Sequence, residues 1–268
     1  VLPYLAETLA AAAAGKFDYA PAVLVYYHCV KVLSEPDPQP HFQQLKALLA
    51  EHWAIFPQAE IRDIFMATIN FCIRQLNTGA RLYIREALEL YRSGLERNLI
   101  LENGFLSKFT YNNILLLAIA ENEWDWALQF LENYRETLPP RDRDSAYRYN
   151  LATYFFRKKD YPRAQEILRH VEFRDVFYNL DSRRMLVRIY FENTEIAALE
   201  SLLDGFAAYL RRKRASLGYH KDLNLNFIRF VKTLLHFDPG DREGRQALRD
   251  KIAAARYVAE REWLLGKV

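Results

Sequence analysis

The sequence predicts an all-α fold made of consecutive antiparallel helix pairs. An aromatic residue followed three positions later by alanine occurs at Trp124 and Ala127 and recurs 37 residues further on, at Tyr161 and Ala164. No segment alternates apolar and polar residues over the length of a strand. The chain has only 9 glycines in 268 residues, which disfavours the turn networks of β proteins. We therefore expect no significant β-sheet.

The N-terminal part divides into helices at residues that interrupt helical structure. The proline-rich segment 34–40 separates the first expected pair from the next helix, which ends near Pro57. A turn around 77–79 joins the following pair, and Gly104 marks the turn after it. The helices expected here cover residues 2–14, 19–33, 41–53, 58–76 and 81–97.

The central part holds the clearest pair. Asp160 can cap its second helix, and Pro162 suits the first turn of that helix, where a missing N–H costs nothing. Asp144 or Ser145 can cap its first helix, after a stop at the prolines of 139–140. The helices expected here cover residues 107–121, 124–137, 145–158 and 161–170.

The pattern weakens toward the C-terminus. Ala198 and Leu202 follow their counterparts in the preceding pair by 34 residues. The turn 238–241 offers Asp241 as a cap for the last helix. Residues 220–265 depart from the pattern, as expected for the capping element that ends a repeat array. The helices expected here cover residues 181–192, 195–212, 220–237 and 242–265.

The segment 148–164 resembles one unit of a tetratricopeptide (TPR) repeat, with a helix, a tight turn at Lys159-Asp160 and a second antiparallel helix. Asn113 and Asn150 share the 37-residue offset of the alanines. The spacings vary around the roughly 34-residue TPR period, so we expect a degenerate, TPR-like array. A generic helical hairpin that reuses alanine and tyrosine is the alternative.

The resemblance implies a TPR-like solenoid, a right-handed superhelix of antiparallel helix pairs with a C-terminal helical cap. The repeats would occupy residues 1–214 and the cap residues 215–268. The best units would be 107–137, 145–171 and 180–205, and the degenerate units 2–33 and 60–97. The chain also resembles a bacterial TPR-like family with no assigned role, so the resemblance indicates no specific function.

The charges are nearly balanced, with 37 basic and 34 acidic residues and a net charge of +3. A dedicated nucleic-acid binder usually carries a larger excess or a dense basic face, so nucleic acid is not the favoured partner. The compact basic run 211–214 is expected at the C-terminal end of a helix, where cations complement the dipole. Contact with phosphate or with an acidic partner is the alternative interpretation of this run.

The sequence favours a cytoplasmic protein. Cys29 and Cys72 lie in apolar helical stretches and are expected to be free thiols, although two cysteines could also pair. Uncharged apolar stretches such as 109–120 are shorter than the roughly 20 residues of a membrane-spanning helix. The apolar run 9–14 lacks the basic lead of a signal peptide, and further sequence can precede Val1.

No catalytic or metal-binding pattern stands out. The six histidines never show a spacing such as His-Glu-x-x-His, and Cys-x-x-Cys, Gly-x-Ser-x-Gly and glycine-rich phosphate loops are missing from the sequence. The carboxylates of 121–123 and 142–144 lie in expected turns, where capping and solvation account for them. We expect no enzymatic activity, no metal and no cofactor.

The TPR resemblance implies a binding groove. In TPR proteins the first helices of successive units line a concave surface on which partner peptides lie. The matching residues here mix aromatic side chains with arginines, which is typical of binding hot spots. They are Asn112, Leu116, Tyr149, Thr153, Phe156, Arg157, Arg183, Val187 and Tyr190.

These observations favour a non-enzymatic interaction module or scaffold that binds a protein or peptide in the groove. One alternative is a helical-repeat RNA-binding protein, because readers of one base per repeat also use helix pairs of about 35 residues. Another is an enzyme whose site these motifs do not reveal. The sequence carries no signal for the identity of the partner or for the oligomeric state.

Overall fold

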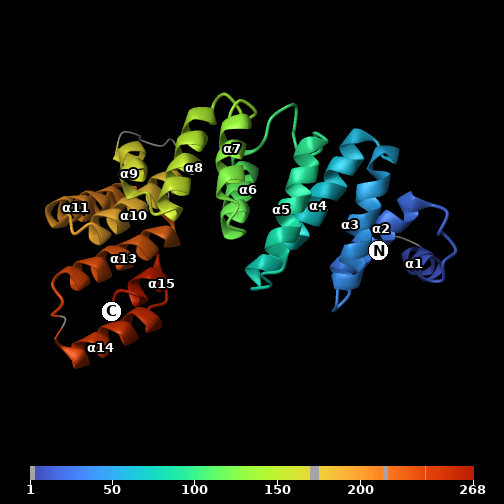
Figure 1. Cartoon of the computed structure of the whole chain (residues 1–268). Helices are drawn as coiled ribbons and strands as arrows, with labels where there is room; N and C mark the ends of the chain where they lie inside the picture. Colours follow the sequence, from blue (N-terminus) through green and yellow to red (C-terminus); the bar gives the residue numbers. More distant parts are fainter. Residues whose placement is uncertain (1–3, 170–174, 214–216, 239) are drawn as a thin grey trace. The chain divides into compact units, whose positions relative to one another are not determined.

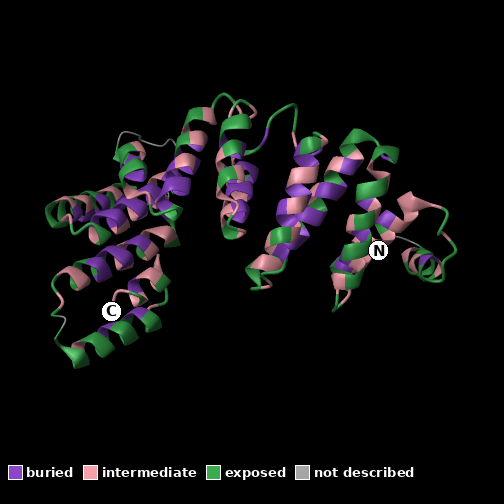
Figure 2. Cartoon of the chain, viewed as in Figure 1, coloured by how far each residue is buried: buried purple, intermediate pink, exposed green. Residues whose placement is uncertain are grey.

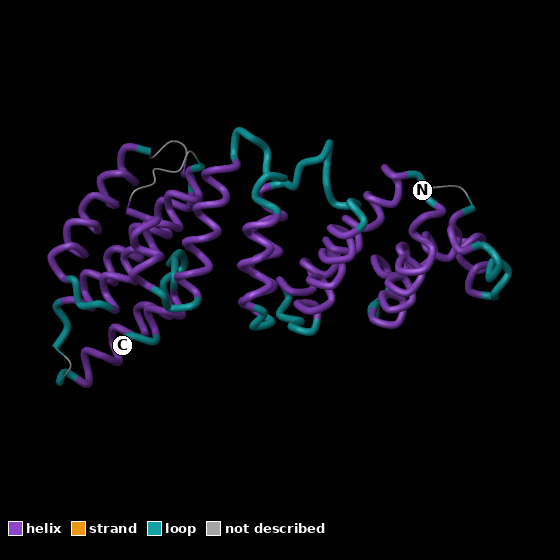
Figure 3. The backbone as a smooth tube through the Cα atoms, turned by 45° about the horizontal axis from the view of Figure 1, so that its top comes forward, coloured by secondary structure: helices purple, strands orange, loops and turns teal. Residues whose placement is uncertain are grey.

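The computed structural model describes residues 4–169, 175–213, 217–238 and 240–268. Across these ranges the protein is all-α, without β-strands (Figure 3); an isolated bridge joins Glu102 and Phe105. The expectation of an all-α fold without a sheet is therefore confirmed. The chain forms two compact units, residues 1–146 and 147–268, which are described separately. The expected boundary between repeats and cap, at 214–215, lies outside the described residues.

The N-terminal unit is a series of packed helices (Figure 1). The most extensive packing joins α2 to α3, α4 to α5 and α6 to α7, and α5 also packs on α6. Contact between α1 and α2, the first expected pair, is smaller. The elements are α1 (Leu5–Ala13), α2 (Pro21–Ser34), α3 (Gln39–His52), the 3-10 helix η1 (Trp53–Ile55), α4 (Gln58–Asn77), α5 (Tyr83–Glu96), α6 (Lys108–Ala120) and α7 (Trp124–Asn133).

The C-terminal unit contains the best TPR-like segment and the final helices. Here α9 and α11 pack against α10, α13 packs on α11, and α14 packs on α15. The helix α8 carries the boundary between the two units. The elements are α8 (Arg143–Arg157), α9 (Tyr161–Arg169), α10 (Val176–Glu192), α11 (Ile196–Arg212), α13 (Tyr219–Leu235), α14 (Arg242–Ala254) and α15 (Arg261–Leu265).

Three hairpins share one turn geometry. The residues at the turns, Asn122, Lys159 and Thr194, have positive φ angles of 60°, 61° and 59°. In each turn the N–H of the next residue donates to the carbonyl oxygen five residues earlier over 2.9 Å, as in a Schellman motif. The turns follow one another at intervals of 37 and 35 residues. The expected helix–turn–helix at Lys159-Asp160 is thus confirmed, and its geometry recurs before and after it.

Small residues let the paired helices approach closely. Ala87, Ala127 and Ala164 are completely buried, each on the second helix of its pair. Buried residues recur along the helices of both units (Figure 2). Large aromatic side chains surround such positions, for example Tyr111, which is fully buried and donates its hydroxyl to the Leu131 carbonyl over 2.6 Å. Close approach at alanine with aromatic filling is the packing that the repeated pattern predicts.

Two of the expected helix caps are confirmed. Asp160 Oδ1 accepts a hydrogen bond from the Arg163 N–H over 3.4 Å, and Pro162 lies in the first turn of α9. Asp241 Oδ1 accepts from the Gly244 N–H over 2.8 Å at the start of α14. Both caps satisfy N–H groups that have no partner within the helix.

Two expected helix starts are wrong. α8 begins at Arg143, ahead of both Asp144 and Ser145, so neither residue is its cap. α10 begins at Val176 instead of 181, because Asp175 caps it by accepting from two N–H groups, that of Phe177 at 2.8 Å being the closer. The first turn of α10 mixes apolar and polar side chains, so the sequence pattern did not identify Asp175 as its cap.

The last expected helix, 242–265, is wrong as a single element. Residues 255–260 leave helical geometry and separate α14 from α15. The Asn226 side chain donates to the Tyr257 carbonyl over 2.7 Å, which ties the interruption to α13. A tertiary contact therefore overrides the helical propensity of this stretch.

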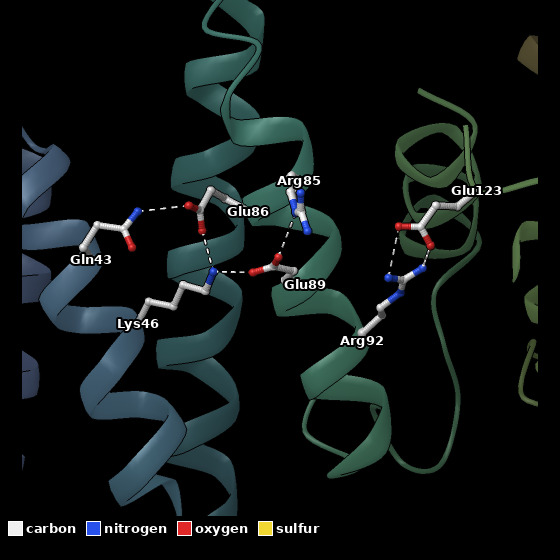
Figure 4. Close-up of polar contacts among 7 residues, drawn as sticks. All are labelled: Gln43, Lys46, Arg85, Glu86, Glu89, Arg92 and Glu123. Atoms are coloured by element: carbon white, nitrogen blue, oxygen red, sulfur yellow. Dashed lines mark hydrogen bonds and ion pairs between the residues drawn. The ribbon is translucent and has the colours of Figure 1, made fainter. Parts of the chain in front are cut away.

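Charged side chains bridge α3 and α5 in the N-terminal unit (Figure 4). Lys46 Nζ lies 2.7 Å from the Glu86 carboxylate and 2.5 Å from that of Glu89. Gln43 also donates to Glu86, over 3.0 Å, and Arg85 Nε lies 3.2 Å from Glu89. Burial by itself lowers the pKa of Lys46, but hydrogen bonds to Glu86 and Glu89 outweigh it and raise the pKa.

A second charged contact links α5 to the start of α7 (Figure 4). Arg92 donates to both oxygens of the Glu123 carboxylate, and its guanidinium carbon lies 4.0 Å from the ring centroid of Trp126. A bidentate pair covered by an indole face is a specific arrangement that lysine could not reproduce. These contacts fix neighbouring helices of the unit to one another.

Both thiols are free, as expected. Burial raises the pKa of Cys29 to about 11 and that of Cys72 to about 12, so neither is an activated nucleophile. Among the described residues, no helix combines the length and the apolar character needed to cross a membrane.

Candidate interaction surface

Three large aromatic side chains are exposed close together in the C-terminal unit. Phe177, Tyr219 and Tyr257 retain 54%, 58% and 37% of their accessible surface. The His220 ring centroid lies 5.0 Å from that of Phe177 and 4.1 Å from that of Tyr219. The Tyr219 and Tyr257 centroids are 6.4 Å apart. These four residues form one connected group, which we call the aromatic surface.

The aromatic surface is assembled from three elements. Phe177 lies in the first turn of α10, Tyr219 and His220 begin α13, and Tyr257 lies between α14 and α15. Asn224, which is completely buried, donates its side-chain amide to the His220 carbonyl over 2.7 Å. This hydrogen bond from a buried side-chain amide holds the backbone beneath the exposed rings in place.

An arginine adjoins the aromatic surface. The Arg256 guanidinium carbon lies 5.0 Å from the ring centroid of Tyr257, a cation–π contact. Across the ranges that the structure describes, Arg256 forms no ion pair with a carboxylate. Its donors are therefore available to a carboxylate or carbonyl of a partner.

An ion cluster anchors the segment that carries Tyr257. Glu260 lies 3.3 Å from Arg184 Nε and 2.8 Å from an Arg188 terminal nitrogen, and Arg184 also donates to Asn224 over 2.9 Å. Burial lowers the pKa of Arg184, and the Glu260 carboxylate opposes this effect. The cluster fixes 255–260 against α10 and α13, so the aromatic surface has a rigid base.

The structure distributes the nine groove residues predicted from the TPR resemblance over both units. Two of them, Asn112 and Leu116, are half-buried on α6 of the N-terminal unit, and the other seven lie on α8 and α10. Arg157 is exposed and Arg183 is half-buried. The remaining five side chains are buried, at most 8% exposed: Tyr149, Thr153, Phe156, Val187 and Tyr190.

The buried members of this set pack inside the C-terminal unit. Tyr190 accepts a hydrogen bond from Arg169 Nε over 2.8 Å, and the Arg188 guanidinium lies 4.7 Å from the Phe156 ring centroid. Thr153 donates to a backbone carbonyl of its own helix over 2.9 Å. Side chains enclosed in this way present little surface to a partner, and the groove stays a prediction.

The sequence did not predict the aromatic surface. Phe177 precedes the helix start expected at residue 181, and Tyr257 falls within a stretch expected to be continuous helix. The available signal was the pair Tyr219-His220 directly after Gly218, an aromatic start to a helix. The grouping itself depends on tertiary contacts between three separated segments.

The described part of the chain holds no group of three or more His, Cys, Asp or Glu side chains arranged to bind a metal ion. Comparison of the chain with protein-family models, with curated proteins and with solved structures finds no match. The geometry of the molecule is therefore the basis for its proposed function.

Proposed function

We propose that this chain is a non-enzymatic interaction module that binds a protein or peptide through the aromatic surface. The observation that carries the proposal is the exposure of Phe177, Tyr219 and Tyr257 in one connected group. Exposed apolar patches on soluble domains commonly mark interaction sites. Tyrosine and arginine are also enriched among the residues that contribute most binding energy, and Arg256 adjoins the patch.

The proposed scaffold is a TPR-like solenoid. The recurring turn at Asn122, Lys159 and Thr194 supports it, as do the buried alanines of the second helices. Stacked helix pairs form rigid supports for extended binding surfaces. A rigid support lowers the entropy lost when a partner binds, so that exposed aromatic groups can contribute more to affinity.

The partner is assigned to the aromatic surface instead of the predicted groove because of exposure. Arg157 is the exposed groove residue of the C-terminal unit, whereas three rings of the aromatic surface are accessible to a partner. Rigid aromatic side chains lose little conformational entropy on binding. This difference makes the aromatic surface the better hot-spot candidate.

A capture experiment tests the proposal. The parent chain and a variant with Phe177→Ala, Tyr219→Ala and Tyr257→Ala would be immobilised and incubated with lysate of the source organism. Quantitative mass spectrometry would compare the bound proteins, and circular dichroism would confirm that both chains are folded. We expect one or a few proteins to be retained by the parent and reduced about tenfold or more by the variant.

A control variant removes three exposed apolar side chains elsewhere. Tyr19→Ala, Leu82→Ala and Phe109→Ala replace three exposed side chains of the N-terminal unit. Equal capture by the parent and by the aromatic-surface variant would contradict the proposal. Capture of nuclease-sensitive material in place of protein would support the RNA-binding alternative.

A further inference from the structure

An open pocket lies in the C-terminal unit, between α11, α13 and the residues that follow α13. Its volume is about 780 Å³, within the range of ligand-binding pockets. Leu225, Ile228, Arg229 and Lys232 line it from one face of α13, and His236, directly after that helix, lines it too. Arg211 of α11 completes the wall.

The pocket combines basic and apolar side chains. Arg229 and Lys232 lie in the last turns of α13, and Leu225 and Ile228 lie in the turns before them. Ile228 is only 4% exposed, so its side chain forms part of the floor. A ligand with both negative charge and apolar surface would match this arrangement.

Two of the pocket cations lack an anionic partner among the described residues. In the residues that the structure describes, Arg211 and Arg229 form no ion pair with a carboxylate. Lys232 does, since its Nζ lies 2.6 Å from the exposed Asp204. Two guanidinium groups beside one apolar floor are thus free to pair with carboxylates in bidentate geometry.

The carboxylates at the pocket edge are already engaged with the backbone. Asp238 accepts from the Gly240 N–H over 2.8 Å, and Asp241 accepts from the Gly244 N–H over 2.8 Å. They neutralise neither arginine by a direct ion pair.

We propose that this pocket binds an acidic peptide segment. Its carboxylates pair with Arg211 and Arg229, and an apolar side chain of the segment packs on Leu225 and Ile228. The nearly balanced charge of the chain favours a peptide over a nucleic acid. Arg211, which opens the basic run 211–214, lines the pocket, and the inference does not rest on the aromatic surface.

Fluorescence anisotropy with the full chain tests this inference. The probe is a fluorescein-labelled peptide, Glu-Glu-Leu-Phe-Glu-Glu, and the reference probe replaces every Glu with Gln. We expect saturable binding of the acidic probe that weakens with added salt. The affinity of the Gln probe should be at least about tenfold lower than that of the acidic probe. Equal binding of both probes, or no binding of either, would overturn the inference.

Two exposed positions provide the matched variants. Arg211→Glu and Arg229→Glu, made separately, should each weaken binding of the acidic probe about tenfold or more, because each removes a charge-assisted pair. Arg212→Glu makes the same charge change one residue from Arg211, at a position that does not line the pocket, and should leave affinity within about twofold. An equal loss in all three would overturn the assignment to the pocket.

A third titration distinguishes an acidic peptide from single-stranded RNA as the ligand. Labelled oligouridine would be titrated under the same conditions. Oligouridine that binds more tightly than the acidic peptide, and is weakened by Arg211→Glu and Arg229→Glu, would replace the peptide inference with single-stranded RNA. A Phe177→Ala chain should keep its affinity for the acidic peptide, so failure here and failure of the aromatic-surface proposal are separable.

Discussion

The rings of Tyr149 and Tyr178 stack with their centroids 3.9 Å apart and their planes 8° from parallel. The pair joins α8 to α10, and Tyr149 also donates its hydroxyl to Asp181 Oδ2 over 3.0 Å. Burial raises the pKa of Tyr149 to about 12, so the hydroxyl stays protonated and donates at any ordinary pH. Both rings are 8% exposed, and this contact is central to the C-terminal unit.

Tyr149→Ala should destabilise the C-terminal unit by about 3–5 kcal/mol, the range for removing a buried aromatic side chain. Tyr149→Phe keeps the ring and removes the hydroxyl, so its cost should be about 1 kcal/mol. Urea unfolding monitored by circular dichroism would measure both costs. Equal costs for the two variants would show that the stacking contributes little.

Ala164→Leu tests the close approach of paired helices. The Ala164 side chain is completely buried on α9, so a larger residue must displace its neighbours. We expect a loss of about 1–3 kcal/mol, measured as a lower melting temperature by circular dichroism. Ala197→Leu places the same side chain at an exposed position of α11 and should change stability by less than about 0.5 kcal/mol. An unchanged melting temperature for Ala164→Leu would contradict the helix-pair interpretation.

The sequence was sufficient to predict the helix pairs because their signals are local. Helical spacing, the alanines at 127 and 164, and the caps at Asp160 and Asp241 each act within a few residues along the chain. The break at 255–260 could not be predicted, since it depends on the bond from Asn226 to Tyr257, which joins α13 to a later segment.

The predicted groove shows the same limit. A repeat pattern indicates which residues match a family position, but exposure depends on what packs above them. Tyr149 and Tyr190 fit the pattern, yet Tyr178 and Arg169 cover them in the structure. Phe177 fits no repeat position and is exposed, and tertiary contacts alone place its ring beside that of His220.

Thr194→Gly should stabilise the protein. Thr194 is an exposed, β-branched residue at a φ angle of 59°, where L-residues pay about 1–2 kcal/mol and glycine pays almost nothing. Part of this gain is lost to the greater flexibility of glycine in the unfolded chain, so we expect a net gain of about 0.5–1 kcal/mol in the free energy of unfolding.

Asn122 provides the control for Thr194, because asparagine tolerates positive φ far better than threonine. Asn122→Gly should therefore give a smaller gain than Thr194→Gly in the same urea titration. A destabilised Thr194→Gly chain would mean that the threonine side chain stabilises the fold by more than its positive φ angle costs.

His28 and His41 should make the N-terminal unit sensitive to acid. Their Nδ1 atoms lie 3.0 Å apart, so one proton can lie between them but two cannot. Burial lowers the pKa of His28, and the adjacent His41 lowers it further. In the unfolded chain a histidine has a pKa of about 6.5. Between the lowered pKa and about pH 6.5 the unfolded state therefore binds more protons than the folded state.

The sign of the effect follows from this difference in bound protons. Stability is fully present above about pH 6.5 and is lost as the pH falls toward the folded-state pKa of His28. His28→Gln should therefore reduce the pH dependence of the free energy of unfolding between about pH 7 and pH 5. Urea titrations of the parent chain and the variant at several pH values would measure the two slopes. The carboxylates are the same in both chains and cannot produce a difference between them, so identical slopes would exclude the histidine pair as the source.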